Sequence, residues 1–132
     1  MAQLSEENLN TLKFNADGLI PAISQQHDSG EILMMAWMNK ASVMETLQTG
    51  VACYWSRSRQ KFWKKGESSG HIQKVKSMRT DCDRDTLLIQ VDQAGVACHT
   101  GRHNCFYLEA ADGDWKEIAK PEVDPDEIYG KK

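Results

Sequence analysis

Apolar residues gather in two neighbouring segments near the start of the chain, 19–26 and 32–38. A run of turn-forming residues separates them, His27-Asp28-Ser29-Gly30-Glu31. Two such segments on either side of a short polar turn favour antiparallel pairing. The sequence therefore predicts that the chain opens with a β-hairpin.

A helix is predicted next, over residues 40–49. Apolar residues recur at helical spacing in and just after this segment: Val43, Met44, Leu47 and Val51. Asn39 is suited to cap the start of the helix, because its side chain can accept a hydrogen bond from a free backbone amide. Gly50 can end the helix in a left-handed conformation.

The rest of the chain is predicted to be mostly extended. Four segments are expected to be strands: 52–58, 71–80, 86–92 and 105–110. Leu87, Ile89 and Val91 share one face of the third of these. Residues 60–70 are expected to form a charged loop punctuated by glycines, and Asp-Gly-Asp at 112–114 predicts a turn. The predicted fold class is α+β, with a mainly antiparallel sheet and one or two short helices.

The chain of 132 residues has the length of a single domain, with polar extensions expected at 1–15 and 120–132. Its net charge is −3, so any anion-binding surface must be local. The N-terminus has no basic start followed by an apolar stretch, so it does not resemble a secretory signal. The longest apolar run, 32–38, is far shorter than the roughly 20 residues that span a membrane. We expect a cytoplasmic protein that does not bind membranes.

The four cysteines favour metal binding over disulfides, because a cytoplasmic protein stays reduced. Cys53 lies in an apolar context and is expected in the core. The other three, Cys82, Cys98 and Cys105, lack the Cys-x-x-Cys spacing of zinc fingers. Three ligands with a free fourth position are typical of catalytic zinc. The alternative is a structural zinc closed by a nearby histidine, for which the candidates are His71, His99 and His103.

The segment Asp81-Cys82-Asp83-Arg84-Asp85 alternates hard oxygen ligands with other side chains. In extended backbone its three aspartates share one side, and Cys82 faces away. A straight strand would hold the outer two about 13 Å apart, too far for one ion with ligand distances of about 2.1–2.5 Å. We therefore predict a turn or bulge. Carboxylates suit magnesium, calcium or manganese, and an acidic turn without an ion is the alternative.

A basic, glycine-rich stretch covers residues 56–71 of this acidic protein. Arginine forks, lysines and loop amides are groups that hold phosphates. Interleaved aromatic residues could stack on a base: Tyr54, Trp55, Phe62 and Trp63. The alternatives are a solvated basic loop with its aromatics in the core, and a surface for nucleic acid. Glu67 and the net negative charge of the chain argue against an extended surface that binds nucleic-acid phosphates.

Four motifs together resemble one known family, phosphoribosyl-AMP cyclohydrolase of histidine biosynthesis. They are Tyr54-Trp55-Ser56-Arg57-Ser58-Arg59, Trp63-Lys64-Lys65-Gly66-Glu67-Ser68-Ser69-Gly70-His71, Asp81-Cys82-Asp83-Arg84-Asp85, and Ala97-Cys98-His99-Thr100-Gly101 with Cys105-Phe106. The resemblance runs in order from Gly18 to Tyr107. Asn104 stands where the family usually has serine. The chain resembles the monofunctional form, without the pyrophosphohydrolase domain that is often fused to it.

The resemblance implies a hydrolase that opens the adenine ring of phosphoribosyl-AMP, breaking a cyclic amidine C–N bond. It also implies an intertwined homodimer, in which Cys82 of one chain and Cys98 and Cys105 of the other hold zinc. The magnesium ligands would be Asp81, Asp83 and Asp85. Hydroxide formed at zinc is expected to attack the amine-bearing ring carbon.

The ring nitrogen that leaves must receive a proton. His99 is the first candidate for proton transfer, and His71 and Glu67 follow. Five residues are candidates for substrate binding: Arg57, Arg59 and Lys65 for phosphate, Trp63 for stacking on the base, and Ser68. Two alternatives from other classes are a zinc-containing nucleic-acid binding module and a protein whose zinc serves only its dimer. We expect no nucleic-acid partner.

Overall fold

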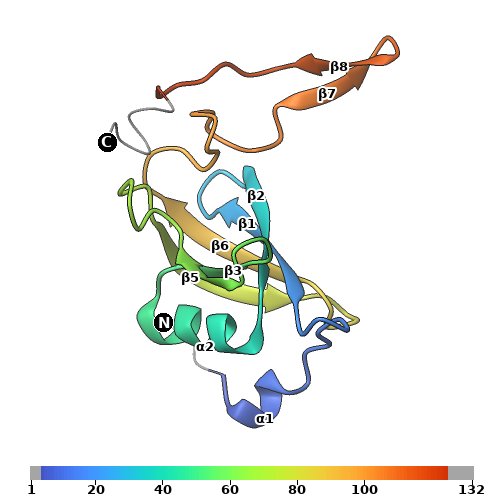
Figure 1. Cartoon of the computed structure of the whole chain (residues 1–132), viewed down its shortest axis with the longest axis vertical. Coiled ribbons are helices and arrows are strands. Elements are labelled where there is room, and N and C mark those ends of the chain that lie inside the picture. The colour runs from blue at the N-terminus through green and yellow to red at the C-terminus, as the bar shows by residue number, and fades with distance from the viewer. Residues whose placement is uncertain (1–3, 125–132) are drawn as a thin grey trace.

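The computed structural model of the chain describes residues 4–124, and these form an α+β fold (Figure 1). The elements, in order, are α1 (Glu6–Leu9), β1 (Ile20–Gln26), β2 (Ile32–Met38), α2 (Lys40–Thr49), β3 (Cys53–Ser56), β4 (Lys61–Lys64), β5 (Gln73–Thr80), β6 (Leu87–Gln93), β7 (Leu108–Ala111) and β8 (Asp114–Glu117). The predicted class, a mainly antiparallel sheet with two short helices, is confirmed.

The main sheet has six strands in the order β4-β3-β2-β1-β6-β5. Every neighbouring pair is antiparallel except β1 and β6, which run parallel. An isolated bridge between Val51 and Lys74 joins the start of β5 to the segment before β3. The sheet therefore curls, and its two ends approach each other around the core.

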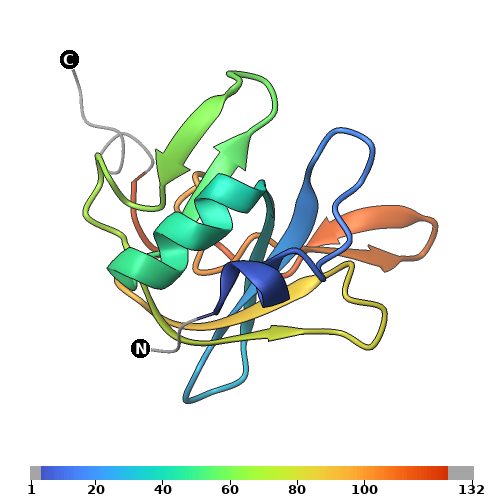
Figure 2. The same ribbon diagram turned by 90° about the horizontal axis from the view of Figure 1, so that it is seen from below.

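The predicted hairpin and helix are both present. β1 pairs with β2 in the register Ile20 to Met38. Asn39 caps α2: its side chain accepts from the amide of Ser42, whose hydroxyl accepts in turn from the amide of Asn39. Gly50 ends the helix at a φ of 76°. Figure 2 shows α2 lying across the curled sheet, where Val43 is fully buried.

One prediction was wrong: residues 61–64 form strand β4 rather than part of a loop. β4 pairs with β3 through aromatic contacts that outweigh its charged residues. The ring centroids of Trp55 and Phe62 lie 5.2 Å apart, and those of Tyr54 and Trp63 lie 5.1 Å apart. Such cross-strand aromatic pairs stabilise a sheet. The basic stretch is thus a hairpin followed by a shorter loop.

The N-terminal segment also differs from the polar extension that we predicted. Leu9 and Leu12 belong to the buried core, and Phe14 packs against it. The backbone amide of Lys13 donates to the carbonyl of Arg84 at 2.8 Å. This segment is therefore part of the domain. Of the predicted extension at 120–132, residues 125–132 lie outside the described residues.

The β7–β8 hairpin stands apart from the main sheet, as Figure 1 shows. The predicted turn at 112–114 connects its strands, but β7 begins at Leu108 rather than at 105. Leu108 is 48% exposed and Trp115 is 67% exposed. A hairpin that buries so little is marginally stable alone. Among residues 4–124, no helix has the length and apolar character needed to cross a membrane.

Candidate active site

The three aspartates meet in a tight turn between β5 and β6. Their ligand atoms lie within 4.8 Å of one another, and all three side chains are exposed. The turn closes by its own bonds: the amide of Arg84 donates to the carbonyl of Asp81 at 3.1 Å, and the amide of Asp85 donates to the Asp81 carboxylate at 3.1 Å. Arg84 has a φ of 59°, which produces the predicted bend.

The chemistry of this turn fits a hard cation. Slight desolvation acts to raise the pKa of Asp81, but hydrogen bonds involving Asp85 and the backbone of Thr86 outweigh it and lower that pKa. Asp81 therefore stays ionised at neutral pH. Exposed carboxylates on one side of a turn leave room for the waters that magnesium retains.

Cys98 and Cys105 are neighbours in the loop between β6 and β7. The Cys98 sulfur lies 3.0 Å from the Thr100 hydroxyl, and the Cys105 thiol lies close enough to Cys98 to feel its charge, although Cys105 as a whole residue is exposed. Burial and the neighbouring Cys98 raise the pKa of the Cys105 thiol to about 12. Two neighbouring thiols do not readily carry two negative charges by themselves, and a bound cation would offset that charge. Such a pair of sulfur ligands fits a soft metal ion.

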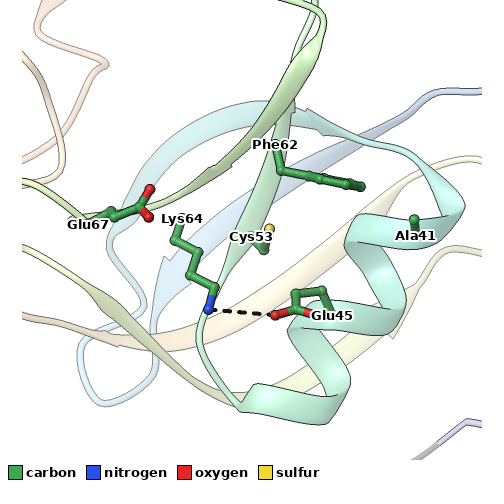
Figure 3. A pocket seen from close by; sticks show the side chains of 6 residues that line it. All are labelled: Ala41, Glu45, Cys53, Phe62, Lys64 and Glu67. Carbon is green, nitrogen blue, oxygen red and sulfur yellow. Dashed lines mark ion pairs between the residues drawn. The ribbon is translucent and has the colours of Figure 1, made fainter.

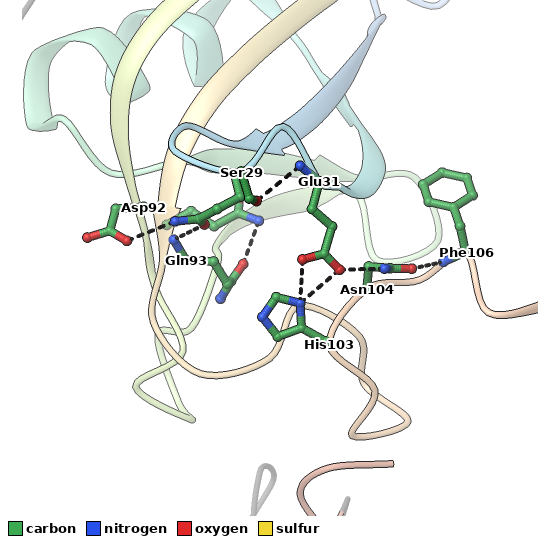
Figure 4. Close-up of polar contacts among 9 residues, drawn as sticks. Ser29, Glu31, Asp92, Gln93, His103, Asn104 and Phe106 are labelled. Atoms are coloured by element: carbon green, nitrogen blue, oxygen red, sulfur yellow. Dashed lines mark hydrogen bonds and ion pairs between the residues drawn. The ribbon is translucent and has the colours of Figure 1, made fainter. Parts of the chain in front are cut away.

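The loop that carries both cysteines is tied to the start of β2. Glu31 accepts from Asn104 at 2.6 Å and contacts Nδ1 of His103 at 2.8 Å (Figure 4). The amide of Cys105 donates to the carbonyl of Leu33 at 2.8 Å. Partial burial acts to raise the pKa of Glu31, but the hydrogen bonds from Asn104 and His103 and the charge of His103 lower it overall. Contacts from the β1–β2 hairpin thus fix the position of Cys105.

A second fastening holds the other side of this loop. The amide of Glu122 donates to the carbonyl of Gly101 at 2.8 Å. A Cβ on Gly101 would lie 1.9 Å from the carbonyl oxygen of Val123, so only glycine fits. Arg102 donates to the carbonyl of Ala119 at 2.9 Å. The chain after β8 therefore packs against the cysteine loop.

Cys82 does not join the other two cysteines. It is exposed in the aspartate turn, whereas Cys98 is buried. Among the described residues, the aspartates are the only group of three or more histidine, cysteine or acidic side chains with ligand atoms within 4.8 Å of one another. One chain thus offers two sulfur ligands at one place and the third elsewhere.

His71 lies beside the cysteine loop and is held by its backbone. The amide of Val96 donates to Nδ1 of His71 at 3.1 Å, so the neutral ring carries its proton on Nε2. The contact from Nδ1 to the Val96 carbonyl, at 3.3 Å, is longer and needs the opposite tautomer. A Cβ on Gly95 would lie 2.6 Å from Nδ1. In the neutral ring Nε2 can therefore donate a hydrogen bond, whereas transfer of a proton needs the imidazolium, whose Nδ1–H would donate to the Val96 carbonyl.

The other two candidates for proton transfer lie in different surroundings. His99 follows Cys98 directly and is exposed. Glu67 is exposed on the loop after β4, where it lines a pocket of about 400 Å³ together with Cys53 and Phe62 (Figure 3). Cys53 is buried, as predicted. Glu67 thus lines the pocket that contains Cys53, while His71 is held by the backbone of Val96.

The candidate substrate-binding residues also divide. Arg57 and Arg59 are exposed in the turn between β3 and β4, and the Arg57 guanidinium lies 4.9 Å from the centroid of the Trp37 ring. Ser68 is exposed on the following loop. Trp63 is half-buried and packs against Tyr54 and the core, so one side of its ring is already covered.

Lys65 is buried, unlike the other candidates for phosphate binding. Its Nζ donates to the carbonyl of Ala97 at 2.5 Å, directly before Cys98. This placement favours an internal role over contact with a substrate phosphate at the surface.

A buried polar network supports this region, and sequence patterns alone did not predict it. Tyr54 donates to Gln73 at 2.6 Å, and Gln73 donates to Ser24 and to Gln93. Gln93 donates in turn to the carbonyls of His71 and Ala94. The one available signal was spacing: Gln73 and Val75 are two residues apart along β5, so both side chains lie on the inward face.

The chain is thus an α+β domain with a cluster of exposed carboxylates and, apart from it, two neighbouring cysteines. The family model described as phosphoribosyl-AMP cyclohydrolase matches residues 34–107. A protein of Magnetococcus marinus with that name is 72% identical, over 94% of this chain and 96% of its own length. Another, of Thioalkalivibrio sulfidiphilus, is 58% identical over 98% of this chain and 99% of its own. A third, of Paramagnetospirillum magneticum, is 61% identical over 93% of each.

The chain belongs to the phosphoribosyl-AMP cyclohydrolase family. This is a family of enzymes, and it agrees with the resemblance seen in the four sequence motifs. Membership decides in favour of an enzyme over the two alternatives that the sequence left open, a nucleic-acid binding module and a protein whose zinc serves only its dimer.

Proposed function

We propose that this protein opens the adenine ring of 1-(5-phosphoribosyl)-AMP by hydrolysis, as a single-domain cytoplasmic enzyme of histidine biosynthesis. The observation that carries the proposal is 72% identity, over nearly the whole of both chains, to a protein named phosphoribosyl-AMP cyclohydrolase. In the reaction, water adds to the amine-bearing ring carbon. The bond from that carbon to the adjacent ring nitrogen breaks, and this nitrogen gains a proton.

The thiol pair is the proposed zinc site. Cys98 and Cys105 would hold the ion, together with Cys82 of a second chain. When bound with an open position, zinc would supply a water nucleophile at neutral pH. The pairing of two sulfurs in one chain, with the third exposed elsewhere, supports this division.

The same division of ligands supports a proposed homodimer. A zinc site with two of its three proposed cysteines is incomplete in one chain, and a partner would supply the last. The β7–β8 hairpin gives independent support, because its exposed Leu108 and Trp115 would be covered in an intertwined dimer.

The aspartate turn is the proposed magnesium site, formed by Asp81, Asp83 and Asp85. Magnesium is commonly bound by one or two carboxylates plus a phosphate of the substrate. The exposed Arg57 and Arg59 are proposed to hold phosphate as well, with Ser68 on the neighbouring loop. The half-buried Trp63 retains one side for stacking on the base.

For proton transfer, His99 remains the first proposal because it directly follows a zinc ligand and is exposed. His71 is the next proposal: as a proton donor it would act as the imidazolium, with Nδ1–H donating to the Val96 carbonyl. Glu67 is the weakest of the three, because it lines a pocket with Cys53 instead.

The function is tested by a steady-state ultraviolet assay of the purified protein with zinc, magnesium and phosphoribosyl-AMP. We expect a spectral change as the ring opens. An unchanged spectrum from folded, metal-loaded protein would rule out the proposed reaction.

A pair of variants tests His71. His71→Asn keeps an acceptor near the position of Nδ1 for the Val96 amide but removes Nε2. His71→Gln places its amide near the position of Nε2 instead. If His71 delivers the proton, His71→Asn folds normally and loses about 10²-fold or more in kcat. Full activity of that variant would rule out His71 and leave His99 and Glu67 as candidates.

A further inference from the structure

Lys65 is a buried cation with no carboxylate beside it. Only 8% of the residue is exposed. Its side chain donates a hydrogen bond from Nζ to the carbonyl of Ala97, at 2.5 Å. Across residues 4–124, none of the ion pairs with acidic side chains involves Lys65. An ammonium taken out of water in this way is costly unless a negative charge lies near it.

The nearest candidates for that negative charge are the two paired sulfurs. Burial lowers the pKa of Lys65, while charge on Cys105 and on Cys98 acts to raise it. The relation is mutual, because Lys65 acts to lower the pKa of the Cys105 thiol. The geometry agrees for Cys98, because the Ala97 carbonyl that accepts from the ammonium immediately precedes that residue.

The backbone around Lys65 fixes the inward direction of its side chain. The amide of Lys65 donates to the carbonyl of Ala52 at 3.0 Å. Gly66 follows with a φ of 81°, and a Cβ there would lie 2.3 Å from the backbone of His71. The chain therefore enters and leaves Lys65 in close contact with neighbouring strands, which limits any outward swing of the side chain.

We propose that Lys65 is a positioning residue for the zinc ligands. Its ammonium holds the carbonyl that precedes Cys98, which fixes the backbone from which this cysteine would reach the metal, and it would offset the negative charge that Cys98 and Cys105 carry once they bind the ion. The inference rests on the proposed zinc site, and it replaces the contact between Lys65 and a substrate phosphate that the sequence suggested.

The neighbouring lysine shows the contrast within the same chain. Lys64 points to the other side of β4, where it is exposed and lies 3.5 Å from Glu45 (Figure 3). Its charge is paired with a carboxylate in solvent, so its loss should cost little. Lys64 therefore provides a matched control that differs by one position and has the same chemistry.

The test compares the zinc affinity of full-length variants by competition with a chromophoric chelator, in the absence of substrate. Lys65→Met keeps the length of the side chain without its charge, Lys65→Gln keeps a hydrogen-bond donor without charge, and Lys65→Arg keeps the charge. We expect both neutral variants to bind zinc about 10 to 100 times more weakly, as loss of an outer partner of a metal ligand typically does. Lys65→Arg should stay within about threefold of the wild type, and Lys64→Met should be unchanged.

A folded Lys65→Met or Lys65→Gln protein with wild-type zinc affinity would overturn the proposal. If neither neutral variant folds, Lys65→Arg decides: a folded arginine variant that has lost zinc affinity contradicts a role for charge. Because no substrate is present, these results stand apart from the ring-opening assay. A wild-type protein that binds no zinc would instead count against the proposed zinc site itself.

Discussion

The aspartate turn and the cysteine loop carry candidate metal ligands in opposite ways. The turn gathers three ligands from five consecutive residues, closes with its own hydrogen bonds and is fully exposed. The cysteine loop buries Cys98 and depends on contacts from β2, from the loop after β4 and from the chain after β8. A hard-ion site is thus built locally, whereas the sulfur site needs most of the fold.

This difference sets the expected size of each substitution. A change in the turn alters one exposed charge and leaves the domain intact. A change at the cysteine loop disturbs buried groups that have few alternative partners, and such changes cost more.

The largest effect is expected from Cys98→Ala. This variant loses one of the two sulfurs that one chain contributes, so zinc content and turnover should both collapse. The loss of zinc affinity and turnover should exceed the roughly 100-fold loss that can follow when a residue hydrogen-bonded to a metal ligand is removed. Zinc analysis and the ultraviolet assay measure it.

Cys53→Ala is the matched control, because Cys53 is buried but belongs to the pocket beside α2. It should cost about 1 kcal/mol of stability and leave zinc content unchanged. A fully active Cys98→Ala protein would mean that the cysteine loop holds no ion needed for turnover.

Gly95→Ala is expected to come next. The added Cβ would lie 2.6 Å from Nδ1 of His71, at a φ of 67° that already strains alanine. Ring displacement and backbone strain together should cost about 2–4 kcal/mol of unfolding free energy, measured by urea titration.

Gly113→Ala separates the two causes. Gly113 has a φ of 80° in the β7–β8 turn, but a Cβ there would meet no atom within 4 Å. It should therefore show the strain alone, about 1–2 kcal/mol. Equal losses in the two variants would mean that the His71 contact contributes nothing.

Asp83→Asn tests the turn itself. Removing one exposed carboxylate charge should raise the magnesium concentration needed for half-maximal activity about tenfold, while zinc content stays at the wild-type level. Asp28→Asn, in the exposed turn between β1 and β2, is a control of the same chemistry. If Asp83→Asn lost its zinc as well as changing its magnesium requirement, the result would contradict two separate metal sites.

The smallest effect is expected at Glu31, which anchors the cysteine loop. Its pKa is lowered in the folded chain, so its stabilising contribution is complete above the ordinary value of 4.5 and disappears as the pH falls through the lower, folded pKa. Glu31→Gln should cost about 1 kcal/mol at pH 7 and almost nothing below the folded pKa. Urea unfolding across that range measures the difference, and a cost independent of pH would refute the ionic anchor.

The same division explains what the sequence could predict. The hairpin, the capped helix, the buried face of Leu87, Ile89 and Val91, and the bend at the aspartates all follow from residues close together in the chain. The sequence did not predict the inward side chain of Lys65, the hold of Glu31 on Asn104, or the parallel pairing of β1 with β6. These depend on contacts between distant segments, which no local pattern encodes.

The fastening of both ends of the described chain has a practical consequence for engineering this protein. Lys13 bonds to Arg84 inside the aspartate turn, and Glu122 bonds to Gly101 inside the cysteine loop. Terminal segments are the usual places to trim a chain or to attach an affinity tag, a fluorophore or a surface linker. In this protein a deletion that reaches Lys13 would disturb one ligand set, and a deletion that reaches Glu122 would disturb the other. A fusion partner should therefore be joined through a spacer, with metal content checked first.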